Sequence, residues 1–225
     1  MANFEIEEAE GTRWVKVTLD NEEIRAEKAS LNHMKGAIVM DTPLPKVSDL
    51  LVSTVSTDSP FRPRYRGTGE LYLESSMGGF HVLQMHEGED WVVENGAYWA
   101  SEGSVQLSLV RERLFTAFWA GEGFFWYHTK LHGGGKVILA AQGPVDEMTL
   151  NGERLVVDGA FVIARTAGVK FTIGRPARTR WSTWLSGQSS ARIYQGTGRL
   201  LMCTTPYWRL AMKNKHLADP MLMNG

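Results

Sequence analysis

Alternation of apolar and polar residues predicts β-strands through most of this chain. Val15, Val17 and Leu19 alternate with polar neighbours, and the same period of two returns at residues 105–109 and 169–173. β-branched and aromatic residues, which fit a pleated and half-buried surface, dominate these runs. We therefore expect an all-β fold.

Three short glycine motifs punctuate the strands at similar intervals. They are Gly67-Thr68-Gly69, Gly133-Gly134-Gly135 and Gly196-Thr197-Gly198. Self-similarity at a long period is typical of a fold built from copies of one unit. We expect each motif to be a bend where a strand changes sheet, because none has the spacing of a phosphate-binding loop. The sequence predicts one β domain over 1–206 and a C-terminal tail over 207–225. Its three repeats cover about 1–75, 76–141 and 142–206.

Turn residues predict a hairpin at the same point of each repeat. Asn151-Gly152 separates two β-favouring runs, and this dipeptide favours a tight turn because both positions need a positive φ. The expected hairpins are Val17–Ile24, Leu83–Val92 and Thr149–Val156.

The strands that follow the glycine motifs share one pattern of inward and outward positions. Alternate residues of a strand share a face, so we expect six residues in the core: Leu71, Leu73, Val137, Leu139, Leu200 and Met202. The outward residues Tyr72, Ile138 and Leu201 are also apolar, which predicts that another sheet or a partner subunit covers them. We also expect Arg199–Cys203 to pair with Trp14–Leu19, because ring closure removes exposed strand edges.

Composition narrows the class of protein. The chain has 225 residues, of which 43% are hydrophobic, and a formal net charge of −1. It can bury a sizeable core, and its charge gives no general attraction to nucleic acid or to anionic membranes. One cysteine, Cys203, excludes an internal disulfide. The acidic N-terminus is unlike a secretory signal, and no apolar run reaches the ~18 residues of a membrane span. We expect a cytoplasmic protein.

Several phrases resemble the Altered Inheritance of Mitochondria protein family. They are Gly-Glu-Gly-Phe-Phe at 121–125, the glycine triplet followed by Lys136-Val137-Ile138-Leu139, and the run Leu155–Phe161. The resemblance spans most of 12–206. It implies three similar TRAP-like, double-stranded β-helix-like units about a pseudo-threefold axis in one closed body. It implies no catalytic residues. Fungal relatives are linked to the mitochondrial inner membrane, a location not expected for a chain without a transit peptide.

No pattern of catalytic or metal-binding residues rises above chance. His128 and His132 stand four apart in a β-favouring segment, where they would lie ~13 Å apart, too far to share an ion. Gly187–Ala191 lacks the last glycine of a serine-hydrolase elbow and its strand–turn–helix context. We expect no metal, no cofactor and no enzyme activity.

Two clusters remain as candidate binding sites. Arg62, Arg64 and Arg66 would share one face of a strand and could bind an anion, a phospholipid headgroup or RNA, although an ordinary solvated face is favoured. Phe124, Phe125 and Trp126 lie in an aromatic segment. For them burial is favoured over a protein interface, and an interface over membrane contact.

The function expected from the sequence is that of a non-catalytic scaffold or interaction protein that acts near a membrane. The alternative is a module that binds a small molecule or an anionic ligand. Expected partners are further copies of the chain, another protein of unknown identity and a peripheral membrane contact, with no nucleic acid.

Overall fold

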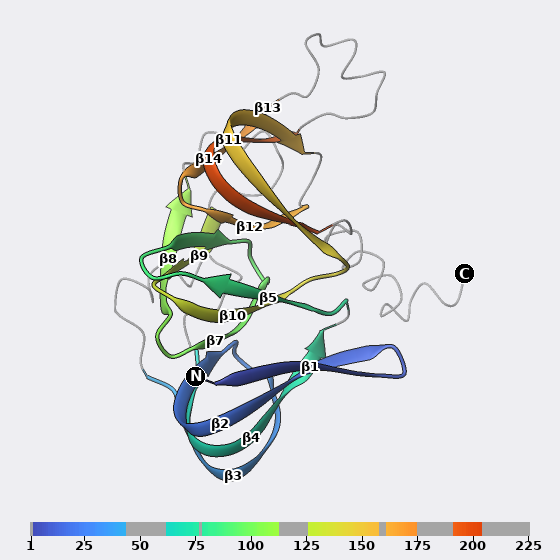
Figure 1. Ribbon diagram of the computed structural model, residues 1–225, viewed down its shortest axis with the longest axis vertical. Coiled ribbons are helices and arrows are strands. Elements are labelled where there is room, and N and C mark those ends of the chain that lie inside the picture. Colours follow the sequence, from blue (N-terminus) through green and yellow to red (C-terminus); the bar gives the residue numbers. More distant parts are fainter. Residues whose placement is uncertain are drawn as a thin grey trace, which may run out of the picture.

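A computed structural model describes residues 2–43, 62–76, 78–112, 126–157, 161–174 and 191–203. Every regular element in these segments is a β-strand, and the strands form two antiparallel sheets of seven strands each (Figure 1). The predicted all-β class is therefore confirmed. No helix in the described segments is long and apolar enough to cross a membrane.

The first sheet has the strand order β3-β4-β2-β7-β10-β5, with β1 paired to β2. Its strands are β1 (Asn3–Ala9), β2 (Thr12–Ala26), β3 (Leu31–Asp41), β4 (Arg64–Ser76), β5 (Phe80–Met85), β7 (Tyr98–Glu102) and β10 (Gly135–Ala140). The second sheet has the order β11-β14-β12-β6-β9-β8, with β13 paired to β14. Its strands are β6 (Asp90–Val93), β8 (Gln106–Glu112), β9 (Trp126–His132), β11 (Val145–Val157), β12 (Val162–Thr166), β13 (Val169–Gly174) and β14 (Ala191–Cys203).

Three consecutive groups of strands are stacked along the long axis of the molecule (Figure 1). We call β1–β4 the first group, β5–β10 the middle group and β11–β14 the last group. The middle group is divided between the sheets, so each sheet joins it to one neighbour. At the first junction, Ile24–Ala26 of β2 pairs with Ala100–Glu102 of β7. At the second junction, Trp91–Val93 of β6 pairs with Ala164–Thr166 of β12.

The predicted hairpins are wrong. The first and third are single bent strands, β2 and β11, and both halves of each pair with a glycine-containing strand, β4 or β14. In the middle group, β5 and β6 belong to different sheets. Asn151 does not have the positive φ expected of it, whereas Asn21 and Gly152 have positive φ, at 55° and 93°. They shift the register without reversing the chain, because the facing glycine motif bends at the same place and keeps both halves paired.

The middle glycine motif behaves as predicted. Gly133 and Gly134 separate β9 in the second sheet from β10 in the first. For the other two motifs the predicted change of sheet is wrong, because they lie inside β4 and β14, which each stay in one sheet. Glycine is needed there for space as well as for backbone angle: a Cβ on Gly67 would lie 2.0 Å from the carbonyl oxygen of Ala37.

The core runs across the junctions. Of the six expected inward residues, five are buried and Met202 is partly buried. The outward residues Ile138 and Leu201 are also buried, because each packs into the hydrophobic cluster of the preceding group. The predicted cover is thus confirmed for these two residues, and it comes from the neighbouring group. Tyr72, at the matching place of the first group, is only half-buried.

The predicted pairing of Arg199–Cys203 with Trp14–Leu19 is wrong. The segment at 14–18 lies between β1 and β4, and that at 200–202 lies between β11 and β12. A strand has two hydrogen-bonding edges, so neither segment has one left. The pseudo-threefold axis and the closed body stay predictions.

Candidate functional site

A buried arginine links the two sides of the first junction. Arg62 is 9% exposed, and its Nη1 lies 3.0 Å from a carboxylate oxygen of Glu27. Its Nη2 donates a hydrogen bond of 2.9 Å to Oγ1 of Thr129, and its guanidinium lies 4.2 Å from the ring centroid of Tyr98. Arg62 and Glu27 belong to the first group, whereas Tyr98 and Thr129 belong to the middle group. One guanidinium therefore contacts both groups, and its charge is matched at close range.

A similar cluster occupies the second junction. Nη1 of the buried Arg192 donates a hydrogen bond of 3.0 Å to the Glu94 carboxylate. Nδ1 of the buried His128 lies 3.7 Å from the other oxygen of the same carboxylate. Arg192 also lies over the ring of Phe171, at 5.7 Å from its centroid. Glu94 and His128 come from the middle group and Arg192 from the last.

Glu27 and Glu94 occupy matching places in the two junctions. Each directly follows the segment that pairs across its junction. The N–H of Glu27 donates to the carbonyl of Trp99 at 2.7 Å, and the N–H of Glu94 donates to that of Ile163 at 2.9 Å. Trp99 and Ile163 both sit at a register shift in their strands. The same backbone contact thus places a carboxylate beside a buried cation at both junctions.

The ionisable groups of the interior are suited to fixed contacts. Nη1 of Arg165 donates to the carbonyl of Val169 at 2.7 Å, and burial lowers the pKa of this guanidinium. Burial also raises the pKa of Tyr98, and it raises that of Tyr194 to about 12. Burial thus favours the neutral form of both phenols.

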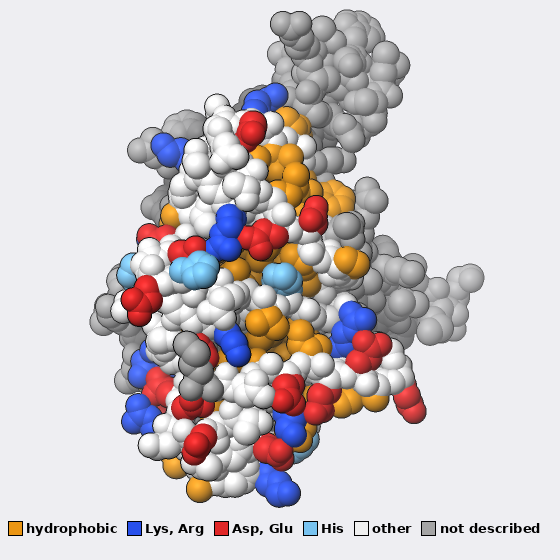
Figure 2. Space-filling model, viewed as in Figure 1, with side chains coloured by type: hydrophobic (Ala, Val, Ile, Leu, Met, Phe, Trp, Pro, Cys, Tyr) orange, Lys and Arg blue, Asp and Glu red, His pale blue; other side chains and the backbone are white. Residues whose placement is uncertain are grey.

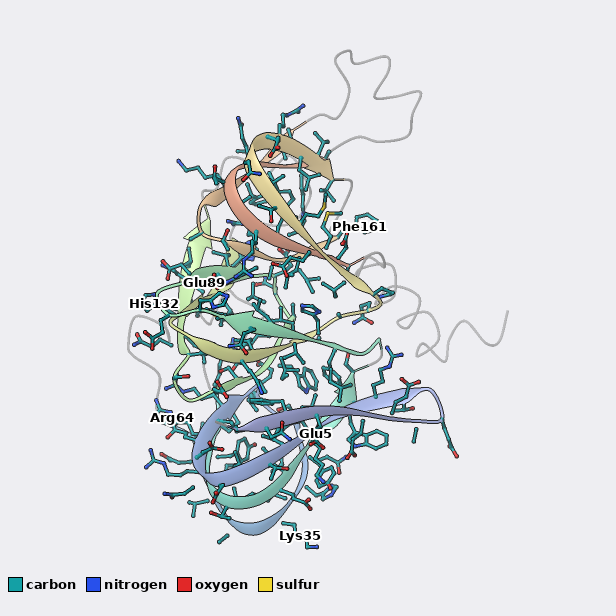
Figure 3. The ribbon with its side chains drawn as sticks, in the orientation of Figure 1. Glu5, Lys35, Arg64, Glu89, His132 and Phe161 are labelled. Atoms are coloured by element: carbon teal, nitrogen blue, oxygen red, sulfur yellow. The ribbon has the colours of Figure 1, made fainter. Side chains whose placement is uncertain are left out.

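The predicted arginine patch is divided between interior and surface. Arg62 is buried in the first junction, whereas Arg64 and Arg66 lie on β4 with side chains that are 41% and 72% exposed. Figure 3 labels Arg64 in the first group of strands. Nη2 of Arg66 donates a hydrogen bond of 2.9 Å to Glu23, and Nε of Arg64 lies 4.0 Å from the same carboxylate. The two surface cations thus share one acidic partner.

The other candidates from the sequence are placed only in part. Phe124, Phe125 and the tail at 207–225 lie outside the described residues, and Trp126 begins β9. The predicted strand for the two histidines is confirmed, since both lie on β9. Nδ1 of His132 is 2.6 Å from Oδ1 of Asp90. Within the described segments, no three His, Cys, Asp or Glu side chains converge in a way that could hold a metal ion.

The outer strand β3 is the most exposed apolar element of the described structure. It lies at one end of the first sheet, and β4 is its neighbour there. Met34, Val39 and Met40 on this strand are 42%, 71% and 50% exposed. Beside it lies a hollow of about 480 Å³, whose lining includes Leu31 and Tyr65. Elsewhere, hydrophobic side chains gather along the middle of one face, among charged residues of both signs (Figure 2).

Residues 4–205 match the family described as Mitochondrial biogenesis AIM24. The chain belongs to the AIM24 family. The match covers all three strand groups, so the two junctions and the outer strand are features of an AIM24 chain.

Two streptococcal proteins are similar to this AIM24 chain. One curated relative is named Uncharacterized protein M6_Spy0233, from Streptococcus pyogenes serotype M6 (strain ATCC BAA-946 / MGAS10394). It is 27% identical over 124 residues, which are 54% of this chain and 49% of the relative. The chain thus spans about half the length of this relative. The crystal structure of protein SPYM3_0169 from Streptococcus pyogenes matches with a TM-score of 0.71 and 19% identity, over 96% of this chain and 100% of that one. At this identity the likeness shows the fold.

Sequence reasoning singled out Arg62 and His128, but it missed the glutamates that they contact and Arg192. Glu27 and Glu94 each follow an apolar strand residue, Ala26 or Val93, at the end of a matching strand run. An aligned acidic residue at this point of two repeats was the available signal. Its meaning depends on Arg62 and Arg192, which lie 35 and 98 positions further along the chain and reach it only through the fold.

Proposed function

We propose that this AIM24 chain is a non-catalytic scaffold or interaction protein. The observation that carries the proposal is the outer strand β3, which combines an edge paired with no other described strand with exposed apolar residues, among them Val39 and Met40. Such a strand offers main-chain hydrogen bonds and apolar contacts to a partner. The buried charges support the same reading, because Arg62 and Arg192 join strand groups to each other.

We also propose that the three strand groups are copies of one unit. In the first and last groups a glycine-bent strand lies between a bent strand and a following strand. In the middle group each of these is divided between the two sheets: β9 and β10 carry the glycine motif, β5 and β6 take the place of the bent strand, and β7 and β8 that of the following strand. Both junctions use the same parts of the unit, and both carry the same glutamate contact. A pseudo-threefold axis would relate the units if a third junction of this kind closed the body.

The family and the net charge are the basis for proposing where this chain acts and with which partners. The family description refers to mitochondrial biogenesis, and we propose for this chain a cytoplasmic role at a membrane surface, with further copies and another protein as partners. With a formal net charge of −1, nucleic acid is not among the proposed partners.

Native mass spectrometry of the purified protein tests the proposal. The expected result is a protein mass with no added small molecule, either as one chain or as a discrete oligomer. A stoichiometric extra mass that is released on denaturation would contradict the scaffold function.

That contradicting result would instead support a ligand-binding module. The hollow of about 480 Å³ beside β3 favours this second function, since its lining joins apolar residues such as Leu31, Met40 and Pro63 to the cation of Lys28. This chemistry fits a small apolar molecule that carries an anionic group.

A further inference from the structure

At each end of the stack, one strand edge corresponds in position to an edge that forms a junction between groups within the molecule. At the first junction, Ile24–Ala26 of β2, which follows the bend of that strand, pairs with β7 of the middle group. At the second junction, β6 of the middle group pairs with β12 of the last group. In the last group the corresponding edge is Leu155–Val157 of β11. In the first group it is His33–Lys35 of β3. Among the described strands, Leu155–Val157 pairs with β14 alone and His33–Lys35 with β4 alone.

The correspondence follows from register against the glycine-bent strands. Tyr65, Leu131 and Tyr194 each lie two residues before a glycine motif. The residues paired with them, which therefore correspond to one another, are Ile24, Trp91 and Leu155. Four residues beyond the middle of each motif, the facing pairs are His33↔Tyr72, Ala100↔Ile138 and Ala164↔Leu201. The following strands also share a register shift, which falls at Asn32, Trp99 and Ile163. A third junction built in the same way would place Met34 opposite Val156.

The exposure of these two residues agrees with an unfilled junction. Met34 is 42% exposed and Val156 is 38% exposed. At the existing junctions, the matching positions include Val92 and Arg165, which face each other and are buried. Two apolar side chains are thus exposed at the position where the existing second junction excludes water.

Tyr72 marks the same end of the molecule. Its counterparts Ile138 and Leu201 are inserted into the hydrophobic cluster of the preceding group. Among the described strands no group lies beyond the first at this end, and Tyr72 is half-buried, with its ring stacked on that of His33 at 4.3 Å between centroids. A preceding group placed on this end would cover Tyr72 as the other two are covered.

The hollow beside β3 is a third sign of the missing neighbour. Leu31 and Pro63 in its lining take the places that Tyr98 and Thr129 have in the middle group. There the space is filled by Arg62 of the preceding group, which lies over the Tyr98 ring and bonds to Thr129. At the end of the first group the corresponding space is a hollow of about 480 Å³.

We propose that Leu155–Val157 of one copy pairs antiparallel with His33–Lys35 of a second copy, so that AIM24 chains join head to tail. The inference rests on the proposed repetition of the unit and on its scaffold function. Within one chain the two edges lie at opposite ends of the stack, with Lys35 at the end farthest from β11 (Figures 1 and 3). The interface continues the pattern of the two junctions that the chain already contains. It is heterologous, so it extends from copy to copy unless the rotation closes a ring.

The contact between copies is weaker than the internal junctions. Arg62 and His128 each stand five residues before a glycine motif, and the last group has Ala191 at that position. Thr129 and Arg192 stand four residues before a motif, and the first group has Pro63 there. The buried cation is therefore absent from this contact, which leaves main-chain hydrogen bonds and apolar cover. Association should accordingly be reversible and dependent on protein concentration.

Disulfide trapping between two single-cysteine chains tests the pairing. In a background with Cys203→Ala, Met34→Cys is made in one chain and Val156→Cys in another, and the two are mixed under mild oxidation. Directly opposed residues of antiparallel strands bring their Cα atoms within disulfide range. We expect a disulfide-linked heterodimer on a non-reducing gel, formed faster than either homodimer. Val39→Cys is the matched control, because it is 71% exposed on the same strand but five residues away from the paired position.

Each result of the trapping decides the proposal. A heterodimer with Met34→Cys but not with Val39→Cys supports it. Equal yields from the two positions, or no heterodimer, overturn it. The double variant Met34→Cys/Val156→Cys tests whether the two edges pair within one chain. A disulfide formed within single chains would show such closure and overturn pairing between copies.

Analytical ultracentrifugation of the protein without cysteine substitutions supplies an independent measurement of its mass in solution. The weight-average mass should rise with concentration, and Val156→Lys should remove this rise because it places a charge in the apolar contact. A monomer at every concentration would contradict the proposal. Failure here leaves the scaffold function standing, because that function is contradicted by a bound small molecule in native mass spectrometry and not by the oligomeric state.

Discussion

Replacing Gly67 with alanine should destabilise the protein strongly, because this position leaves no room for a side chain. Gly67 has a φ of +138°, and a Cβ there would lie 2.0 Å from the carbonyl oxygen of Ala37 on β3. A residue other than glycine at such backbone angles costs roughly 1–3 kcal/mol. Real Cβ contacts essentially never fall below 3.0 Å, so the strands must also move apart.

The required movement breaks pairing at the centre of the β3–β4 ladder. Gly36, Ala37 and Ile38 pair there with residues 67–69. Losing two or three ladder hydrogen bonds, at about 1 kcal/mol each, brings the total loss to about 3–6 kcal/mol. Folded domains are stable by about 5–15 kcal/mol, so Gly67→Ala should lie close to the limit of folding.

Urea unfolding followed by tryptophan fluorescence measures the effect, and the chain has eight tryptophans as probes. Gly11→Ala is the matched control: Gly11 has a φ of +76°, but nothing lies within 4 Å of its added Cβ. That variant isolates the backbone cost of about 1–2 kcal/mol. If Gly67→Ala proved no less stable than Gly11→Ala, the steric reasoning would be refuted.

Three further predictions concern ionisable groups. Arg62→Leu should cost about 2–4 kcal/mol of stability, because it leaves the carboxylate of Glu27 largely buried without its cation, and adding Glu27→Gln should recover part of the loss in urea unfolding. Stability should fall as pH rises from 10 towards 12, because burial raises the folded pKa of Tyr194 to about 12 while the unfolded phenol ionises near 10. Stability should also fall as pH drops below about 4, because hydrogen bonding from Lys130 lowers the folded pKa of Asp90, so that the unfolded chain binds the proton first.

Each of these predictions has a control. Arg66→Leu removes a side chain that is 72% exposed and should change stability by less than about 0.5 kcal/mol; an equal loss from both arginine variants would contradict the role of burial. Urea unfolding at stepped pH follows the other two. Tyr194→Phe should flatten the alkaline loss and Asp90→Asn part of the acid loss, and an unchanged pH profile in either variant would count against the assignment.

Much of the secondary structure was predictable from the chain. The period of two identified the strands at 105–109 and 169–173, which appear as β8 and β13. It also placed Leu71, Val137 and Leu200 in the core, where all three are fully buried. These features are local, because the pleat alone decides which neighbours share a face.

Turn chemistry was predicted only in part. Of the two residues of Asn151-Gly152, both expected to have a positive φ, Gly152 has one and Asn151 does not; Asn21, for which none was predicted, has one. Whether such a residue reverses a chain or only bends it depends on the facing strand. Here the glycines of β4 and β14 bend at the same point, so the register shifts and the strands continue.

The sequence by itself determined the strand class, the inward faces and the places where the backbone must bend. Only the tertiary structure decided which edges meet, and with them the candidate site. The Arg62–Glu27 and Arg192–Glu94 pairs, and the exposure of Met34 at an unmatched edge, all depend on pairing between strands distant along the chain. The physical reason is that a strand has two equivalent hydrogen-bonding edges. Alternation assigns its faces, but the packing of whole groups selects its neighbours.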